Sequence, residues 1–195
     1  MHFMKRVLDF ILSLIVLIIL FPIFLIIGIA IKIDSKGPIF FKQKRLGKDG
    51  KVFLIYKFRT MVDNAEKIGS GIYTSETDSR ITKVGRFLRK TSLDEIPQLI
   101  NILKGEMSIV GPRPPVPYHP HKYEDYPERQ RKRFTVLPGI TGFAQVNGRN
   151  NLTWDERIEY DLKYVENYSL LLDINIIFKT IGCVFNKKSI YSNNE

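Results

Sequence analysis

The feature that most constrains this chain is an apolar segment near its start. Residues 10–31 carry no charged side chain, and 18 of these 22 residues are Leu, Ile, Val or Phe. At about 1.5 Å per residue, a helix of this length covers roughly 33 Å, close to the ~30 Å hydrocarbon thickness of a bilayer. We therefore expect the segment to lie in a membrane.

Basic residues flank this segment on both sides, which is unusual for a helix that crosses once. Lys5 and Arg6 precede it. The basic residues that follow it are Lys32, Lys36, Lys42, Lys44 and Arg45. Because basic flanks mark the cytoplasmic end of a span, a single crossing cannot explain both. Pro22 lies in the middle of the segment and favours a kink. We predict a re-entrant helix-break-helix hairpin over residues 1–36.

Two other interpretations of the segment stay open. The first is an ordinary single span, against which the basic flanks argue. The second is a cleaved signal peptide, for which Gly28 and Ala30 offer a loose cleavage pattern. The apolar run is longer than the ~7–15 residues usual for a signal peptide.

Composition excludes several classes of protein. The 195 residues have a net charge of +10, 26% charged and 12% aromatic residues, which excludes a wholly disordered chain. Cys183 is the only cysteine, so an intramolecular disulfide and Cys₄ or Cys₂His₂ zinc sites are impossible. This cysteine usage indicates that the main domain faces a reducing compartment, most simply the cytoplasm.

Residues 37–195 are predicted to form one membrane-associated cytoplasmic domain of a mostly helical α+β fold. Residues 38–41 and 52–56 flank the turn-rich stretch 47–50 and indicate a β-hairpin. Helical patterns cover residues 80–90, 92–105, 124–134 and 153–168, the last with a capping box between Thr153 and Glu156. Residues 173–188 are amphipathic, typical of a core helix or of one lying in the membrane interface.

Asp94 and Glu95 are the first candidates for chemistry. One interpretation is structural, because Ser92 and Glu95 have the spacing of a capping box for a helix beginning near residue 92. Pro97 supports another, in which the helix begins at the proline and both acids lie on the loop before it. Local physics does not choose between them. In both cases adjacent carboxylates point in different directions, which predicts different roles.

Several cationic or polar groups are candidates for binding phosphate. Arg113 lies between prolines, which restrict the backbone that presents its guanidinium. Four basic residues recur at steps of three, typical of one face of a helix: Arg80, Lys83, Arg86 and Arg89. The glycine-rich stretch 137–150 adds Gln145, Asn147 and Arg149, which are groups suited to polar recognition in general. His2, His119 and His121 have no metal-binding spacing and fit surface or turn roles better.

These motifs together strongly resemble the monotopic phosphoglycosyl transferases, the bacterial sugar transferases that begin glycan assembly on a polyprenyl phosphate. The resemblance covers nearly the whole chain. It includes residues 5–9, 56–61, 89–98, 103–114, 138–150 and 171–174. One departure is that Phe21 precedes Pro22 where the family often has Ser, whose hydroxyl could bond a carbonyl freed by the kink.

The resemblance implies a ping-pong transfer that releases UMP. Asp94 would attack the sugar-bearing phosphorus of a UDP-sugar, forming a covalent phosphosugar intermediate that polyprenyl phosphate then accepts. Glu95 would help to bind Mg²⁺. Arg89 and Arg113 would contact phosphate, with Lys57, Arg59 and Arg149 as further phosphate-binding positions and Asp173 as a structural or ligand contact.

The resemblance also implies partners and a location. They are an N-acetylated or deoxygenated UDP-hexosamine, polyprenyl (undecaprenyl) phosphate, membrane lipids and a possible homodimer partner, with no nucleic acid, at the cytoplasmic face of a bacterial inner membrane. The alternative function is a membrane-anchored basic module that binds nucleic acid or anionic lipid without catalysis. Such a module would tolerate replacement of Asp94 by Asn, whereas the enzyme would not.

Overall fold

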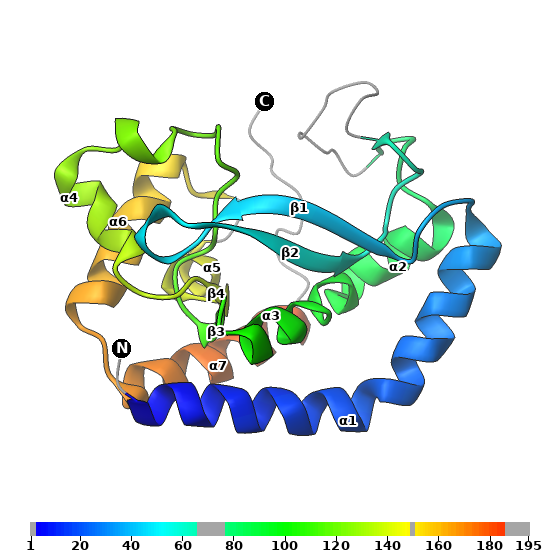
Figure 1. The fold of residues 1–195 in the computed structure, drawn as a ribbon, viewed down its shortest axis with the longest axis horizontal. Coiled ribbons are helices and arrows are strands. Elements are labelled where there is room, and N and C mark those ends of the chain that lie inside the picture. The colour runs from blue at the N-terminus through cyan, green and yellow to red at the C-terminus, as the bar shows by residue number, and fades with distance from the viewer. Residues whose placement is uncertain (1–2, 66–76, 149–150, 186–195) are drawn as a thin grey trace.

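The computed structural model describes residues 3–65, 77–148 and 151–185. These residues form a mostly helical α+β fold with two small sheets, which confirms the predicted fold class. Helix α1 (Phe3–Asp34) runs along one edge of the molecule, and the remaining elements all lie on one side of this helix (Figure 1).

Helix α1 bends without breaking. It continues through Pro22, and the ribbon is straight over its first part and then turns toward the start of the β-hairpin (Figure 1). The structure therefore shows a bend within a continuous helix, and the re-entrant arrangement stays a prediction. A proline removes one backbone donor and clashes one turn back, so a kink within a continuous helix is its usual effect. Among the described residues, α1 is the one helix long and apolar enough to cross a membrane.

Both parts of α1 pack on the rest of the chain while leaving much apolar surface exposed. Ile27 and Ile31 are buried in a cluster with Phe58 and Leu88. Large side chains on the outer face, such as Ile19, are well over half exposed. Helix α1 is thus covered by protein on one side and presents large apolar side chains on the other, and an exposed apolar surface of this kind is typical of an interaction site.

The predicted β-hairpin is confirmed and is longer than expected. Strands β1 (Phe40–Leu46) and β2 (Val52–Phe58) pair antiparallel with Phe40 opposite Phe58. A 3₁₀ turn, η1 (Lys48–Gly50), lies in the connection. The other edge of β2 meets Asn101 of α3 (Gln98–Lys104), whose amide accepts from Tyr56 N at 3.0 Å and donates to Leu54 O at 2.7 Å. One buried side chain thus satisfies two backbone groups of that edge.

The second sheet is short and parallel. Strand β3 (Ser108–Val110) pairs with β4 (Gly139–Thr141), which leads into α5 (Phe143–Asn147). The backbones approach closely here, since a Cβ added at Gly139 would lie 2.1 Å from the nitrogen of Gly111. A side chain at residue 139 would force the two strand segments apart. This would also displace the loop after β3, which carries Arg113.

The remaining helices match their predictions to different degrees. Helix α2 spans Lys83–Thr91, and α6 (Trp154–Glu166) begins with the predicted capping box at Thr153. Helix α7 (Leu170–Phe185) begins three residues earlier than predicted. The prediction of a single helix over residues 124–134 is wrong. The segment consists of η4 (Tyr123–Asp125), α4 (Glu128–Arg131) and η5 (Lys132–Phe134). Pro127 is the N-cap of α4 and separates this helix from η4.

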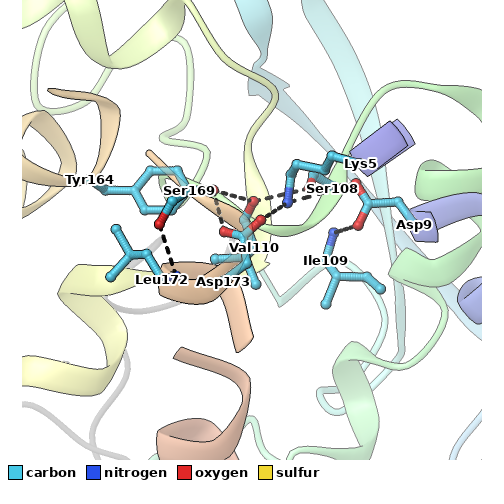
Figure 2. Close-up of polar contacts among 9 residues, drawn as sticks. All are labelled: Lys5, Asp9, Ser108, Ile109, Val110, Tyr164, Ser169, Leu172 and Asp173. Carbon is cyan, nitrogen blue, oxygen red and sulfur yellow. Dashed lines mark hydrogen bonds and ion pairs between the residues drawn. The ribbon is translucent and has the colours of Figure 1, made fainter. Parts of the chain in front are cut away.

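A buried polar network fastens the first turns of α1 to the domain (Figure 2). Lys5 Nζ donates to Asp173 Oδ2 of α7 at 2.7 Å, and the hydroxyl of Tyr164 in α6 donates to Asp173 Oδ1 at 2.7 Å. Asp9 accepts from the hydroxyl of Ser108 in β3 at 2.7 Å. Asp173 is thus a structural contact between α1 and α7, one of the two roles expected for it.

Candidate active site

Asp94 and Glu95 lie on a short turn between two helices. The turn η3 (Leu93–Glu95) follows α2, and α3 begins only at Gln98, with Pro97 as its N-cap. Ser92 adopts a left-handed conformation with φ of 57° and its side chain caps no backbone group of this turn. The second sequence interpretation is therefore confirmed, in that both acids precede the helix, and the predicted capping box of Ser92 is wrong.

Glu95 receives two cationic side chains on one oxygen. Lys57 Nζ lies 2.7 Å from Glu95 Oε1, and Arg113 Nη2 lies 3.1 Å from the same atom. Burial opposes ionisation of Glu95, but Lys57 and Arg113 outweigh it and hold the pKa of Glu95 well below its ordinary value. The charge of Glu95 in turn raises the pKa of Arg113. Glu95 is therefore an ionised carboxylate locked between a strand and a loop.

Asp94 has a different electrostatic environment. Burial raises its pKa to about 6, opposed by the positive charge of Lys57 and reinforced by the negative charge of Glu95. Arg89 and Arg113 also favour its ionised form. This raised pKa still lies below neutral pH, so the ionised form of Asp94 prevails at pH 7. The two adjacent acids thus have clearly different proton affinities.

Arg89 approaches the acids from α2, where it is anchored by a residue that follows β2. Its Nε donates to the hydroxyl of Thr60 at 2.8 Å. The α2 helix can approach Thr60 because residue 85 is glycine, and a Cβ there would lie 2.0 Å from the Thr60 carbonyl oxygen. Thr60 was not singled out from the sequence, although it lies within one of the motifs that carry the resemblance.

The structure brings Lys57, Arg89 and Arg113 to the two acids, whereas the guanidinium of Arg59 is engaged elsewhere. Arg59 is buried and donates both terminal nitrogens to the backbone carbonyls of Ser35 and Lys36, just beyond the end of α1. Its guanidinium therefore ties β2 to α1. Arg149 lies outside the described residues, as do His2 and residues 187–188.

The predicted basic helix face is only partly present. Arg80 precedes α2 and is held by Asp78, with Nη2 and Oδ2 2.6 Å apart. Lys83 and Arg86 are exposed, so Arg89 is the member of this row that reaches the acids. Local spacing could not distinguish these roles, because each depends on what packs against the helix.

The two carboxylates can supply some, but not all, of the oxygen ligands that a divalent cation needs. No group of three or more His, Cys, Asp or Glu side chains suited to a metal occurs among the described residues. Within the same part of the chain, Glu95 Oε2 makes no hydrogen bond, since both partners use Oε1. Mg²⁺ is usually held by one or two carboxylates together with substrate phosphates and water. The residues therefore fit Mg²⁺ bound jointly with a phosphorylated substrate.

Comparison with known proteins decides the family. The family model described as bacterial sugar transferase matches residues 1–187. The chain belongs to the bacterial sugar transferase family. It is 46% identical over 194 residues to the UDP-glucose:undecaprenyl-phosphate glucose-1-phosphate transferase of Klebsiella pneumoniae and 42% identical to the protein of the same name in Escherichia coli K12.

Coverage differs between relatives. Each of these two alignments includes 96% of this chain and 41% of the relative, so the chain spans about two fifths of their length. The exopolysaccharide production protein ExoY of Sinorhizobium fredii is 40% identical over 201 residues, which are 96% of this chain and 88% of that protein. Membership in a family of transferases favours an enzyme over the non-catalytic basic module.

Proposed function

We propose that this protein is a phosphoglycosyl transferase that moves a hexose 1-phosphate from a UDP-hexose to a polyprenyl phosphate and releases UMP. The observation that carries the proposal is the arrangement of Asp94 beside Glu95, whose carboxylate is held by Lys57 and Arg113. Together with Arg89, these five side chains have one positive charge in excess. Such a cluster suits a substrate with a diphosphate group.

The first step uses Asp94 as the nucleophile. One carboxylate oxygen forms a bond to the sugar-bearing phosphorus, the bond from this phosphorus to the bridging oxygen breaks, and the electron pair leaves with UMP. In the second step, an oxygen of polyprenyl phosphate attacks the same phosphorus. The bond to Asp94 breaks, the carboxylate is regenerated, and the product is a polyprenyl diphosphate sugar. The ionised fraction of Asp94 at neutral pH supports a nucleophile without a separate general base.

The main barrier to this step is charge repulsion. Two like charges 4 Å apart repel by about 4 kcal/mol at an effective dielectric constant of 20, and a diphosphate carries more than one charge. Arg89 and Arg113 are placed to offset this repulsion, and Lys57 lowers the negative potential of Glu95. Glu95 would help to hold Mg²⁺, which would supply positive charge to offset that of the diphosphate.

Helices α1 and α7 support a proposal for how the protein meets the membrane. A re-entrant α1 would place both of its basic flanks at the cytoplasmic face, with the acids at the level where a soluble nucleotide and a lipid phosphate both arrive. Helix α7 supports an interfacial position, because Ile176 is buried in the core while Leu171 and Phe178 are 79% and 69% exposed. We place the protein at the cytoplasmic face of a bacterial inner membrane, and a homodimer stays a prediction.

The comparisons differ from the sequence-based expectation in the sugar of the donor nucleotide. The sequence resemblance implied an N-acetylated or deoxygenated hexosamine, whereas the Klebsiella and Escherichia relatives are named for UDP-glucose. We therefore propose UDP-glucose as the first donor to test, with undecaprenyl phosphate as acceptor.

The test is release of UMP by the purified protein in detergent or nanodiscs. A panel of UDP-glucose, UDP-galactose and UDP-N-acetylglucosamine is supplied with undecaprenyl phosphate and Mg²⁺. UMP release from UDP-glucose that stops when Mg²⁺ is chelated supports the proposal. UDP rather than UMP as product would identify an ordinary glycosyl transferase and contradict it.

A further inference from the structure

The loop that carries Arg113 is held through its backbone carbonyls. Each of residues 112–115 has a carbonyl that accepts a hydrogen bond from another part of the chain. Two donors are backbone groups, with Gly139 N to Pro112 O at 3.0 Å and Leu46 N to Pro115 O at 2.9 Å. The other two donors are arginine side chains, and they hold the carbonyls of Arg113 and Pro114.

This loop depends on carbonyl contacts because proline supplies no backbone donor. Residues 112, 114 and 115 are proline, so Arg113 is the single residue of the four with an N–H. The carbonyls are thus the main backbone groups by which the rest of the protein can fix the loop. The position of the loop decides whether the exposed guanidinium of Arg113 contacts Glu95. In the structure Arg113 Nη2 lies 3.1 Å from Glu95 Oε1.

Arg133 is the more deeply buried of the two arginine donors. It is 2% exposed, and its Nη2 donates both to Arg113 O at 3.0 Å and to Asp161 Oδ2 of α6. Burying an ion pair costs desolvation that the mutual attraction seldom repays in stability. Stability alone is therefore a weak explanation for this buried pair. Because Arg133 also donates to the carbonyl of Arg113, the pair is better explained by a role in positioning that residue.

Arg45 of β1 is the second arginine donor. Its Nη1 donates to Pro114 O at 3.1 Å, and its Nη2 donates to Gln43 Oε1 on the same strand. Arg45 and Arg133 thus grip adjacent carbonyls from the β-hairpin and from η5. We propose that Arg133, held by Asp161 and assisted by Arg45, is a positioning residue that keeps Arg113 in contact with Glu95.

This inference rests on the proposed function, and its test has one readout that needs no activity. The first variant is Arg133→Met with Asp161→Leu, which removes both buried charges together and so avoids leaving one of them unpaired. The matched control is Arg129→Met with Glu159→Leu. That pair joins α4 to α6 by similar contacts but is exposed, and within the described part of the chain its hydrogen bonds are confined to the pair itself.

The readout without activity is the side-chain Nε–H signal of Arg113 in NMR spectra, assigned from an Arg113→Lys sample. We expect the signal to shift or broaden in the Arg133/Asp161 variant and to stay in place in the Arg129/Glu159 control. An unshifted signal in the correctly folded Arg133/Asp161 variant overturns the inference. If that variant does not fold, Arg45→Lys replaces it with the same expectation, and an unshifted Arg113 signal there overturns the inference.

The kinetic readout is a double-mutant cycle on UMP release. We expect the Arg133/Asp161 change to lower kcat/KM by about 10- to 100-fold in the wild-type background. In an Arg113→Ala background the same change should have little further effect, because the residue being positioned is absent. An equal loss in both backgrounds overturns the inference. If the wild-type protein releases no UMP while the NMR signal responds as expected, the proposed function fails and the positioning role stands.

Discussion

Lys57 Nζ lies 2.7 Å from Oε1 of Glu95, and this contact makes two adjacent acids chemically unequal. Glu95 is kept ionised by the direct salt bridge, whereas burial raises the pKa of Asp94 to about 6. A group that stays charged is suited to holding cations. Asp94 has no salt bridge within the described ranges, and a carboxylate of that kind is better suited to attack phosphorus. Asp94 is therefore the proposed nucleophile, and Glu95 has the supporting role.

The first prediction concerns pH. Because Asp94 must be deprotonated to attack, kcat/KM for UMP release should be nearly constant above neutral pH and fall as the pH drops through about 6. Lys57→Met removes a positive charge that lowers this pKa, so the midpoint of the profile should move to higher pH. Profiles measured for both proteins at fixed Mg²⁺ check this. A midpoint that moves to lower pH in the variant would contradict the assignment.

The second prediction concerns the contact between α2 and Thr60. Gly85→Ala places a Cβ 2.0 Å from the Thr60 carbonyl oxygen and should destabilise the protein by about 1–3 kcal/mol. It should also lower UMP release, because Thr60 holds Arg89. The control is Gly182→Ala in α7, where nothing lies within 4 Å of the added Cβ and helix propensity improves. Thermal unfolding in detergent and UMP release are measured for both. Equal behaviour of the two variants would argue against the close contact.

The third prediction concerns the network that fastens α1. Lys5→Met leaves the buried Asp173 carboxylate without its cation and should destabilise the protein by about 3–5 kcal/mol. The double variant Lys5→Met with Asp173→Leu removes both charges, so it should recover part of this loss. The thermal midpoint in nanodiscs is the measurement. A double variant less stable than Lys5→Met would show that the ion pair is not the reason for the loss.

The fourth prediction concerns the topology of α1. Single cysteines are introduced as His2→Cys or Lys36→Cys in a Cys183→Ser background. Both sites should resist a membrane-impermeant maleimide in intact cells and react after permeabilisation, because a re-entrant helix keeps both flanks on the cytoplasmic side. Pro22→Leu removes the cause of the bend and should expose one of the two sites. Labelling of either site in intact cells without that change rules out the re-entrant arrangement.

Local features of the sequence were the ones that predicted structure well. The capping box at Thr153 and the β-hairpin depend on residues close in the chain, and both are present. The start of α3 was ambiguous because Ser92 and Pro97 give opposing local signals, and the fold favours Pro97. Where a capping residue and a proline compete within a few positions, local rules thus left alternatives that packing resolved.

In the candidate site, too, local patterns identified the residue types but not the role of each residue. Arg59 and Arg89 are both basic residues within motifs of the resemblance, yet one binds carbonyls just beyond α1 and the other reaches the acids. Their roles depend on the tertiary position of neighbouring backbone, which no local pattern encodes. The same holds for Arg133 and Asp161, which are 28 positions apart and form a buried pair.

The most direct test of the account is mass spectrometry of the protein trapped with UDP-glucose in the absence of polyprenyl phosphate. The account predicts an added hexose phosphate on the peptide that contains Asp94, its loss on addition of polyprenyl phosphate, and its absence in Asp94→Asn. An unmodified peptide in a protein that turns over only when both substrates are bound together would contradict it.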